Sequence, residues 1–475
     1  MLGLFGTLNL ASRSLQAQMT GVEVTGQNLA NVNTTGYSRQ TVQISASPDI
    51  LTRLGPEGTG ADATSIQRVV SALLNGRIQS QNSTGGYWNA QQSALQTAQN
   101  GLGEFLNGSG AASSASGTTG STTDSGLGGQ LSALFNAFQS VATSPTSVSA
   151  RQALLGQAQT VAASFNNINS QLNSANTALN LSLGDDVTSA NQLLTQIATL
   201  NSQITTAQAG GGNANELSDE REQDLENLAQ LTNITTSTGS NGAVNVTIGG
   251  QTLVSGNTLS DTLQTYKSSN GNLLVQTAAG QVNLTLTGGS MQGTIDARDG
   301  TLATLQSGMN TLANTLITQV NTVHDAGYGL TGSTGNSFFN GTDAGTITVN
   351  QALVDNPSLV QASASASASG DNTVALQLAQ LATTAQASLN NQTVTGSYTS
   401  SVASLGSALD NANTEVASQT AVTNMLSTQR GSISGVNVDE EMTNMMTFQR
   451  AYEASAQLVS TVNTLLGDTL AMKTS

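Results

Sequence analysis

The residues of this chain that could carry out chemistry are few. Among its 475 residues there is one histidine and no cysteine, so thiolate catalysis, disulfide bonds and cysteine-ligated zinc are excluded. The single histidine, His324, is followed by Asp325, and adjacent residues are poorly placed to chelate one metal ion or to form a catalytic triad. We therefore interpret His324 as a residue of the surface or of a helix end.

Two acidic runs could supply paired carboxylates for acid–base catalysis. They are Asp219-Glu220-Arg221-Glu222 and Asp439-Glu440-Glu441. Both lie in the first turns of predicted helices, where negative charge stabilises the helix dipole by about 0.3–1 kcal/mol. We favour this structural interpretation, and the second run could also contact a neighbouring subunit. The glycine-rich stretch at 58–60 follows no clear strand, so it does not indicate a nucleotide site. The sequence thus predicts no catalytic, cofactor-binding or metal-binding residue, and no enzyme.

Composition narrows the possible partners. The net charge is −16, and the 12 lysines and arginines are too few for a nucleic-acid surface. Charged residues make up 8% of the chain, against roughly 25% in ordinary soluble domains, so we expect a surface of hydroxyl and amide side chains. No apolar run approaches the ~20 residues that span a bilayer, so membrane insertion is not expected. The apolar start precedes Arg13 instead of following basic residues, and we interpret it as part of the mature protein.

The first segment, residues 4–35, has an apolar residue at every seventh position, the period of a coiled-coil helix. Gly21 and Gly26 interrupt the pattern, each at a cost of about 1 kcal/mol relative to alanine, so the helix is not expected to be stable alone. Gly36 is a candidate left-handed cap that ends it. The positions of the repeat are Leu8, Leu15, Val22 and Leu29.

The last segment, residues 437–470, shows an apolar stripe at alternating spacings of three and four. Asn437 can cap the start of this helix, with Glu440 returning the hydrogen bond. Because both ends of the chain carry such stripes, we expect them to pair with each other or with neighbouring copies. The apolar positions that we assign to the assembly interface here are Met445, Phe448, Tyr452, Val459, Val462 and Leu466.

The long middle of the chain is predicted to be helical with one β insertion. Asn213 and Glu216 form a candidate capping box for the last helix before the insertion. In the insertion, apolar residues alternate at Val244, Val246 and Ile248 before a Gly-Gly turn, as in a β-hairpin. The expected segments are a strand at 42–44, helices at 64–106, 131–231, 301–323 and 373–389, a Gly/Ser/Thr linker at 107–130, strands at 244–286 and 346–349, and a loop at 362–369.

The predicted fold is mainly α with inserted β, in an elongated multidomain protein. Its terminal helices pair as a coiled coil, followed by a helical middle domain and a small antiparallel β-domain at the tip. The expected domains are a terminal assembly domain (1–60 plus 431–475), a long-helix middle domain with a short β element (61–237 plus 301–430) and the inserted β-domain (238–300).

Sequence motifs at both ends resemble one known family. The stretch from Thr25 to Tyr37 is similar to the N-terminal pattern of bacterial flagellar rod, hook and junction proteins, and the stretches at 435–441 and 448–456 to their C-terminal pattern. Stretches at 37–40, 215–221, 338–350 and 370–372 resemble the hook-associated proteins of the first hook–filament junction. The family-motif residues are Asn28, Asn31, Asn33, Gly36, Tyr37, Gln449, Arg450, Ala451 and Tyr452.

The resemblance implies a non-enzymatic axial component of the bacterial flagellum that joins hook to filament outside the cell. It implies type III export without a cleaved signal peptide. The implied partners are other copies of the chain, hook protein, the second junction protein (hook-associated protein 3) and an export chaperone on the C-terminal helix. No cofactor, nucleic acid or membrane insertion is implied.

Three alternatives remain open from the sequence. A hook-type or rod-type axial protein would share the terminal motifs, although such proteins generally lack the long helical layer. A secreted adhesin would fit the acidic Ser/Thr/Gly-rich composition but has no need of striped helices at both ends. A peptidoglycan hydrolase would need a convergent carboxylate or histidine site, and none is found in the sequence.

Overall fold

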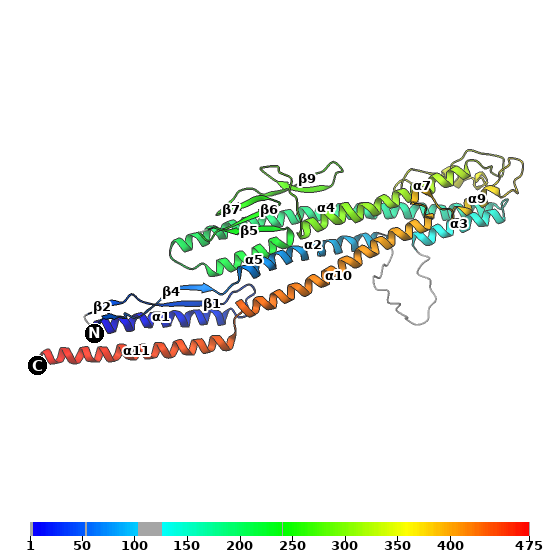
Figure 1. Cartoon of the computed structure of the whole chain (residues 1–475). Coiled ribbons are helices and arrows are strands. Elements are labelled where there is room, and N and C mark those ends of the chain that lie inside the picture. Colours follow the sequence, from blue (N-terminus) through cyan, green and yellow to red (C-terminus); the bar gives the residue numbers. More distant parts are fainter. Residues whose placement is uncertain (1–2, 53–54, 103–125, 240, 475) are drawn as a thin grey trace, which may run out of the picture.

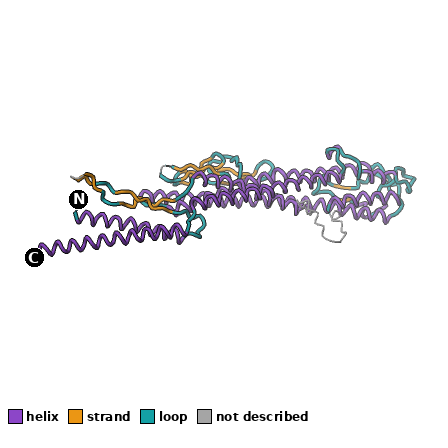
Figure 2. Tube along the Cα trace, turned by 60° about the horizontal axis from the view of Figure 1, so that its bottom comes forward, coloured by secondary structure: helices purple, strands orange, loops and turns teal. Residues whose placement is uncertain are grey.

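The computed structural model describes residues 3–52, 55–102, 126–239 and 241–474. Long helices run nearly parallel to one axis, and the two described ends of the chain lie at the same end of an elongated molecule (Figures 1 and 2). The helices of this part of the chain are α1 (Leu4–Ala30), α2 (Ala72–Leu102), α3 (Leu127–Thr143), α4 (Val148–Ala209), α5 (Asn215–Leu231), α6 (Gly289–Asp296), α7 (Ala303–His324), α8 (Gln351–Asp355), α9 (Thr373–Gln380), α10 (Val394–Ser434) and α11 (Val438–Thr474). A π-helical turn (Ala297–Leu302) joins α6 to α7, and short 3₁₀ turns lie at Pro357–Leu359 and Ala387–Leu389.

The strands form small antiparallel sheets. They are β1 (Gln40–Ala46) with β4 (Ala61–Arg68), β2 (Ile50–Thr52) with β3 (Gly55–Glu57), β5 (Ile234–Thr238), β6 (Val244–Ile248), β7 (Gln251–Ser255) and β8 (Thr258–Leu259) in one sheet, β9 (Leu263–Lys267) with β10 (Leu273–Thr277), and β11 (Phe339–Asn340) with β12 (Thr348–Val349). The fold is therefore mainly α with inserted antiparallel β, as the sequence predicts.

The terminal helices pair with each other, which confirms the pairing expected from their stripes (Figure 1). The pair is antiparallel, because the N-terminal part of α11 meets the C-terminal part of α1. Asn28 contacts Glu441, and Ser14 contacts Ser455 two heptads further along the pair. The β1–β4 hairpin covers α1 on another side, so the stripe on α1 faces two neighbours.

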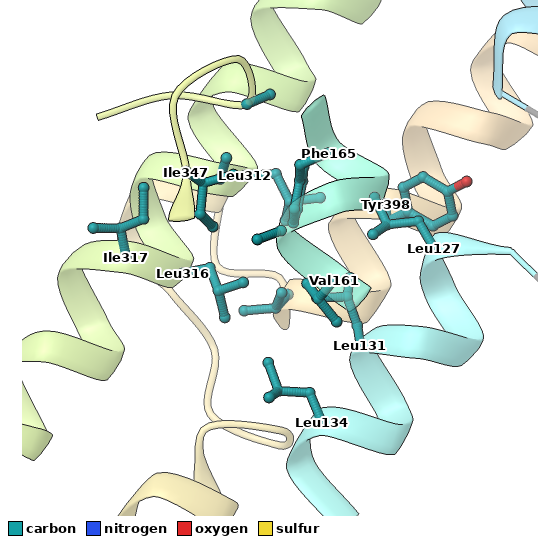
Figure 3. Close-up of a cluster of buried hydrophobic side chains, with 14 of the residues drawn as sticks. Leu127, Leu131, Leu134, Val161, Phe165, Leu312, Leu316, Ile317, Ile347 and Tyr398 are labelled. Carbon is teal, nitrogen blue, oxygen red and sulfur yellow. The ribbon is translucent and has the colours of Figure 1, made fainter. Parts of the chain in front are cut away.

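The long helices α2, α4, α7 and α10, with α3 at their far end, form a helical rod, and this rod contains the largest apolar core. Leucines and phenylalanines of α3, α4 and α7 meet residues of α10 and of the loop before β12, and Figure 3 shows part of this cluster. Leu131, Phe165 and Leu312 are fully buried there. Burial of one such side chain contributes about 1.5–3 kcal/mol to folding, and interdigitated packing of many of them makes the rod rigid.

Strands β5 to β10 pack on the helical rod, chiefly on α4. The predicted alternation at Val244, Val246 and Ile248 is confirmed, since these side chains are buried and the intervening ones are half-buried. They share an apolar cluster with α4, α5 and Met291. One detail of the prediction is wrong: these sheets lie along the flank of α4, while α3 and α9 occupy the end far from the termini (Figure 1). The apolar face of the sheet decides this position, because α4 offers it a long apolar side.

Several predicted boundaries are wrong. Residues 61–68 form strand β4 because Val42 and Ile66 pair across the hairpin, and the helix begins at Ala72. The linker predicted at 107–130 lies largely outside the described residues, and α3 already begins at Leu127. The helix predicted at 373–389 ends at Gln380, and the strand expected around Leu284 makes one bridge only, between Asn283 and Gln276. The loop at 362–369 and the β element around 346–349 are confirmed. The division into three domains stays a prediction.

Candidate assembly site

The apolar stripe of α11 faces α1 within the same chain. Val462 is buried, whereas Met445, Phe448, Val459 and Leu466 are half-buried. The sequence-predicted stripe thus first serves the pairing of the two ends. Contacts of these residues with other copies stay a prediction.

Gly21 of α1 provides the space for the ring of Phe448. A Cβ atom added at Gly21 would lie 2.7 Å from the ring, closer than real Cβ contacts come. At Gly26, by contrast, the nearest atom is Cε of Met445 at 3.9 Å, an ordinary van der Waals contact. Gly21 therefore does not simply weaken α1, as the sequence suggests, but permits the close approach of α11.

The heptad positions of α1 are Leu8, Leu15, Val22 and Leu29, and all four are half-buried. Apart from Val24, the buried positions of α1 are instead small or polar, among them Ala11, Ala17 and Asn28. Small residues let the backbones of α1 and its neighbours come close, and the leucines flank the contact.

Apolar side chains remain exposed on the helix pair. At least half of the side-chain surface is exposed at Met442, Leu470 and Met472 of α11. The same is true of Phe5 and Met19 of α1. Tyr452, which belongs to both the predicted interface and the family motif, is 40% exposed. Continuous apolar exposure along a helix is characteristic of surfaces that bind another protein.

Asn28 is the polar centre of the terminal region. Its amide nitrogen donates to the carbonyl oxygen of Gln40 at 2.8 Å and to Oε2 of Glu441 at 2.9 Å. Its oxygen accepts from the hydroxyl of Tyr37 at 2.8 Å and from the backbone N–H of Gln40 at 2.9 Å. The side chain is fully buried, and with both donors and both acceptor sites used it is completely satisfied. One motif residue thus joins α1, β1 and α11.

The carboxylates around Tyr37 change its titration. Burial first, and then the negative charges of Glu216, Asp219 and Glu441, raise the pKa of Tyr37 to about 12. The phenol therefore keeps its proton, and its hydrogen bond to Asn28, throughout the physiological pH range.

The other motif residues have separate positions. Asn31 is the C-cap of α1, and its amide donates to the carbonyl oxygen of Gln27 at 3.0 Å. Asn33 is exposed, and Gly36 has φ of +83°, in the turn after the helix and not at its cap. Because Asn31 already ends the helix, the cap predicted at Gly36 is wrong. On α11, Gln449 and Arg450 are exposed and Ala451 is half-buried.

The predicted start of α11 is confirmed in part. The side-chain oxygen of Asn437 accepts from the backbone N–H of Asp439 at 3.0 Å, as a cap does. Glu440, however, accepts from Nη1 of Arg39 at 2.7 Å, so it binds the loop before β1. Glu441 is buried and bonds to Asn28. The acidic run therefore links α11 to α1 and to the loop before β1, besides complementing the helix dipole.

The acidic run at 219–222 differs from the prediction. Helix α5 starts at Asn215, so Asp219 lies beyond the first turn, and Ala214 takes the N-cap position without a side-chain hydrogen bond. The carboxylate of Asp219 accepts from the backbone N–H and hydroxyl of Ser38 at 2.9 and 2.8 Å, and from Nη1 of Arg68 at 2.6 Å. Sequence periodicity could not reveal this contact, since the partners are more than 150 residues away.

His324 ends α7, as expected, but it is fully buried and not at the surface. Its Nδ1–H donates to the carbonyl oxygen of Asn336 at 2.8 Å, and Nε2 accepts from the backbone N–H of Gln361 at 2.9 Å. Burial, together with the positive charge of Arg151, lowers the pKa of His324 to about 4. The imidazole is thus neutral at pH 7 and connects two loops to the helix.

The lowered pKa of His324 predicts that the folded protein becomes less stable in acid. In the unfolded chain the imidazole takes up a proton near pH 6.5, whereas in the folded chain it does so near pH 4, so stability is lost as the pH falls between these values. The full loss is about 3 kcal/mol. Urea unfolding at pH 7, 6 and 5 should show this slope in the native protein and not in a His324→Gln variant, which is less stable at pH 7.

The difference in unfolding free energy between the native protein and the His324→Gln variant isolates the pH dependence that His324 causes. Burial and the negative charge of Glu220 raise the pKa of the Asp224 carboxyl to about 6. Asp224 therefore adds stability as the pH falls, which is opposite to the effect of His324. It is present in both proteins and cancels. Parallel stability curves for the two proteins would show that His324 does not titrate as described.

The described part of the chain shows neither a metal-binding cluster nor a membrane-spanning helix. Its residues hold no group of three or more histidines and carboxylates that could bind a metal ion. None of its helices is long and apolar enough to cross a membrane. A groove of about 970 Å³ between α7 and α10 is lined by hydroxyl, amide and small apolar residues such as Thr304, Ser401 and Asn390. Side chains of this kind offer no general acid or base near neutral pH.

Three family patterns match the chain. The pattern described as flagellar hook-associated protein FlgK helical domain matches residues 112–339. That of the flagella basal body rod protein matches residues 8–37, and that of the flagellar basal body rod FlgEFG protein C-terminal matches residues 432–472. The two rod-type matches correspond to α1 with its turn and to α11.

Two relatives that align with this chain over nearly all of its length are named flagellar hook-associated protein 1. The one from Bacillus subtilis is 28% identical, with 98% of each chain covered, and the one from Escherichia coli is 23% identical, with 96% of this chain and 98% of the relative covered. The solved structure of the flagellar hook junction protein FlgK from Burkholderia pseudomallei covers 75% of this chain and 100% of its own, with a TM-score of 0.63 and 18% identity. The fold is thus similar to that structure.

Proposed function

We propose that this chain, a member of the flagellar hook-associated protein 1 family, is a structural axial component of the bacterial flagellum that joins hook to filament. The observation that carries the proposal is the antiparallel pair of α1 and α11, which unites the two terminal family motifs through Asn28 and Glu441. The helical-domain match over 112–339 favours a junction protein over a hook or rod protein. Its place is the flagellum, and its role is structural and not enzymatic.

Self-assembly is supported by the apolar surfaces of α1 and α11 that remain exposed to solvent in the single chain. Identical subunits that meet through two different patches form rings or helices instead of closed dimers. The exposed apolar residues on the flanks of α11, such as Met442 and Leu465, supply one such patch, and Phe5 and Met19 of α1 another. The helix pair is expected to gain much of its order from these contacts, because most helix stability comes from packing.

The partners follow from the same surfaces and from the family. Copies of the chain would pack side by side, hook protein would lie at one end of the ring and the second junction protein at the other. Before export, a chaperone would cover the apolar flanks of α11, and the chain would leave through the flagellar type III apparatus without a cleaved signal peptide. Covering these flanks would also restrain premature assembly.

A single substitution on α11 tests this function. Tyr452→Asp places a charge on a 40% exposed side chain, so the isolated chain should keep its fold, but apolar contact with a neighbouring subunit is lost. A strain with this variant as its only copy should make hooks, shed filament protein into the medium and lose motility. Gln457→Asp, on the same helix at an exposed polar position, should remain motile.

Two outcomes would contradict the proposal. Normal filaments and motility in the Tyr452→Asp strain would exclude the assigned interface. Normal filaments in a strain that lacks the gene altogether would exclude the junction role itself. Circular dichroism of both purified variants should match the native protein, which separates loss of assembly from loss of folding.

A further inference from the structure

The terminal region is joined to the rod without an apolar core. We define the terminal region as residues 3–71 and 435–474. From here on, the rod means the described residues from 72 to 434, including the β strands that pack on its helices. The buried apolar clusters of the described chain lie wholly in the rod: one around α3, α4 and α7, one under the β strands, and a small one around Leu74, Ile78 and Leu426. Apolar burial usually supplies most of the free energy that fixes two parts of a protein together.

Two short segments make the covalent connection. Residues 69–71 lead from β4 into α2, and residues 435–437 lead from α10 into α11. Backbone hydrogen bonds lie at the second segment. The N–H of Arg39 donates to the carbonyl oxygen of Ser434 at 2.8 Å, and the N–H of Gly435 donates to that of Gly431 at 3.0 Å. A few residues at the ends of elements are sufficient to act as a hinge.

Side-chain contacts from α5 close this junction. We call Asn215, Glu216 and Asp219 the α5 latch. Asn215 donates to Oε1 of Gln40 at 3.0 Å and to the carbonyl oxygen of Ile66 at 3.1 Å. Glu216 accepts from the amide of Gln40 at 3.0 Å. The latch thus binds both strands of the β1–β4 hairpin.

Asp219 is the strongest member of the latch. It accepts two hydrogen bonds from Ser38 and forms an ion pair with Arg68, and its carboxylate is nearly buried. Hydrogen bonds in which one partner is charged are roughly twice as strong as those between neutral groups. The opposite face of α5 is fixed in the rod, since Leu225 and Leu228 lie in the cluster under the β strands. Asp219 therefore holds the terminal region against a rigid support.

We propose that the α5 latch, with Asp219 at its centre, sets the direction of the terminal helix pair relative to the rod, and that its release lets the pair swing about residues 69–71 and 435–437. The helix pair itself stays intact on release, because Asn28 and Glu441 hold it from within. A polar latch of this kind fixes one geometry in the free chain and can open without exposing apolar surface.

Spin-label distances in the full-length chain test the latch. The chain has no cysteine, so cysteines introduced at exposed Glu453 on α11 and Ser202 on α4 report the angle across the junction. In Asp219→Ala the width of this distance distribution should become at least about twice that of the native protein, as expected for a released hinge. Glu220→Ala, the adjacent exposed carboxylate on α5, should leave the width unchanged.

A second label pair separates release from unfolding. Cysteines at exposed Gln16 and Glu453 lie on the two helices of the terminal pair, and their distance should not change in Asp219→Ala. Arg68→Gln removes the ion pair from the other side and should broaden the Glu453–Ser202 distribution as well. An unchanged distribution across the junction in both variants would overturn the proposal, and so would broadening within the terminal pair.

Discussion

Asn28→Asp is expected to open the terminal helix pair near the start of α11. The new side chain cannot donate to Glu441 or to the carbonyl oxygen of Gln40, and it places a second carboxylate within hydrogen-bond distance of Glu441 in a fully buried position. The lost bonds and the like-charge contact should cost about 3 kcal/mol or more. Hydrogen exchange should show faster exchange of the α1 and α11 amides, with unchanged protection in α4.

The pH dependence of this variant identifies the cause. Two close carboxylates raise the pKa of one of them, so the pair takes up a proton as the pH falls. The protonated form can donate a hydrogen bond, and the defect should diminish between pH 7 and pH 5. Asn33→Asp adds the same charge at an exposed position three residues beyond the helix end and should exchange like the native protein. Equal exchange rates in the two variants would contradict the assigned role of Asn28.

Gly21→Ala and Gly26→Ala are expected to have opposite effects on the helix pair. At Gly26 the space beside Met445 accommodates a methyl group, so the variant should gain up to about 1 kcal/mol from helix propensity. At Gly21 the methyl group would collide with the ring of Phe448, and overpacking should cost about 1–3 kcal/mol. Thermal unfolding of the terminal helices, followed by circular dichroism and hydrogen exchange, measures both changes.

A double-mutant cycle shows whether the collision is the reason. In a Phe448→Ala background the ring is absent, so Gly21→Ala should become neutral or stabilising. The same background should leave the gain from Gly26→Ala unchanged, because its nearest neighbour is Met445. A loss from Gly21→Ala that persists without the ring would show that α1 and α11 do not approach each other at this position.

The elements of this protein are determined largely by local sequence. The alternating spacing of three and four around Phe448 and Val459 predicts the face that α11 turns to its partner, and the alternation around Val246 predicts a strand with one buried face. Such periodicities record which side of an element avoids water, and they can be read without knowing the partner. The motif residues at both ends likewise predict the family, because recognition of a sequence pattern needs no coordinates.

The partners of each face are decided only by the tertiary structure. In the sequence Gly21 only interrupts the apolar repeat of α1. In the fold, the ring of Phe448 from the other end of the chain occupies the space that a side chain at position 21 would need. Asp219 reads as a charge that complements a helix dipole, but Ser38 and Arg68 make it a contact between two parts of the molecule. His324 has no recognisable sequence signal, since both of its hydrogen-bond partners are backbone groups.

The physical reason is the same in each case. Helix propensity and apolar periodicity act over a few residues. They depend only on the sequence of the segment itself and not on its surroundings in the fold. Space, charge pairing and desolvation depend on atoms that folding brings together from hundreds of residues apart. The sequence therefore determines that both ends of this chain form striped helices, and the fold decides that they pair antiparallel, with Asn28 between them and α5 as their support.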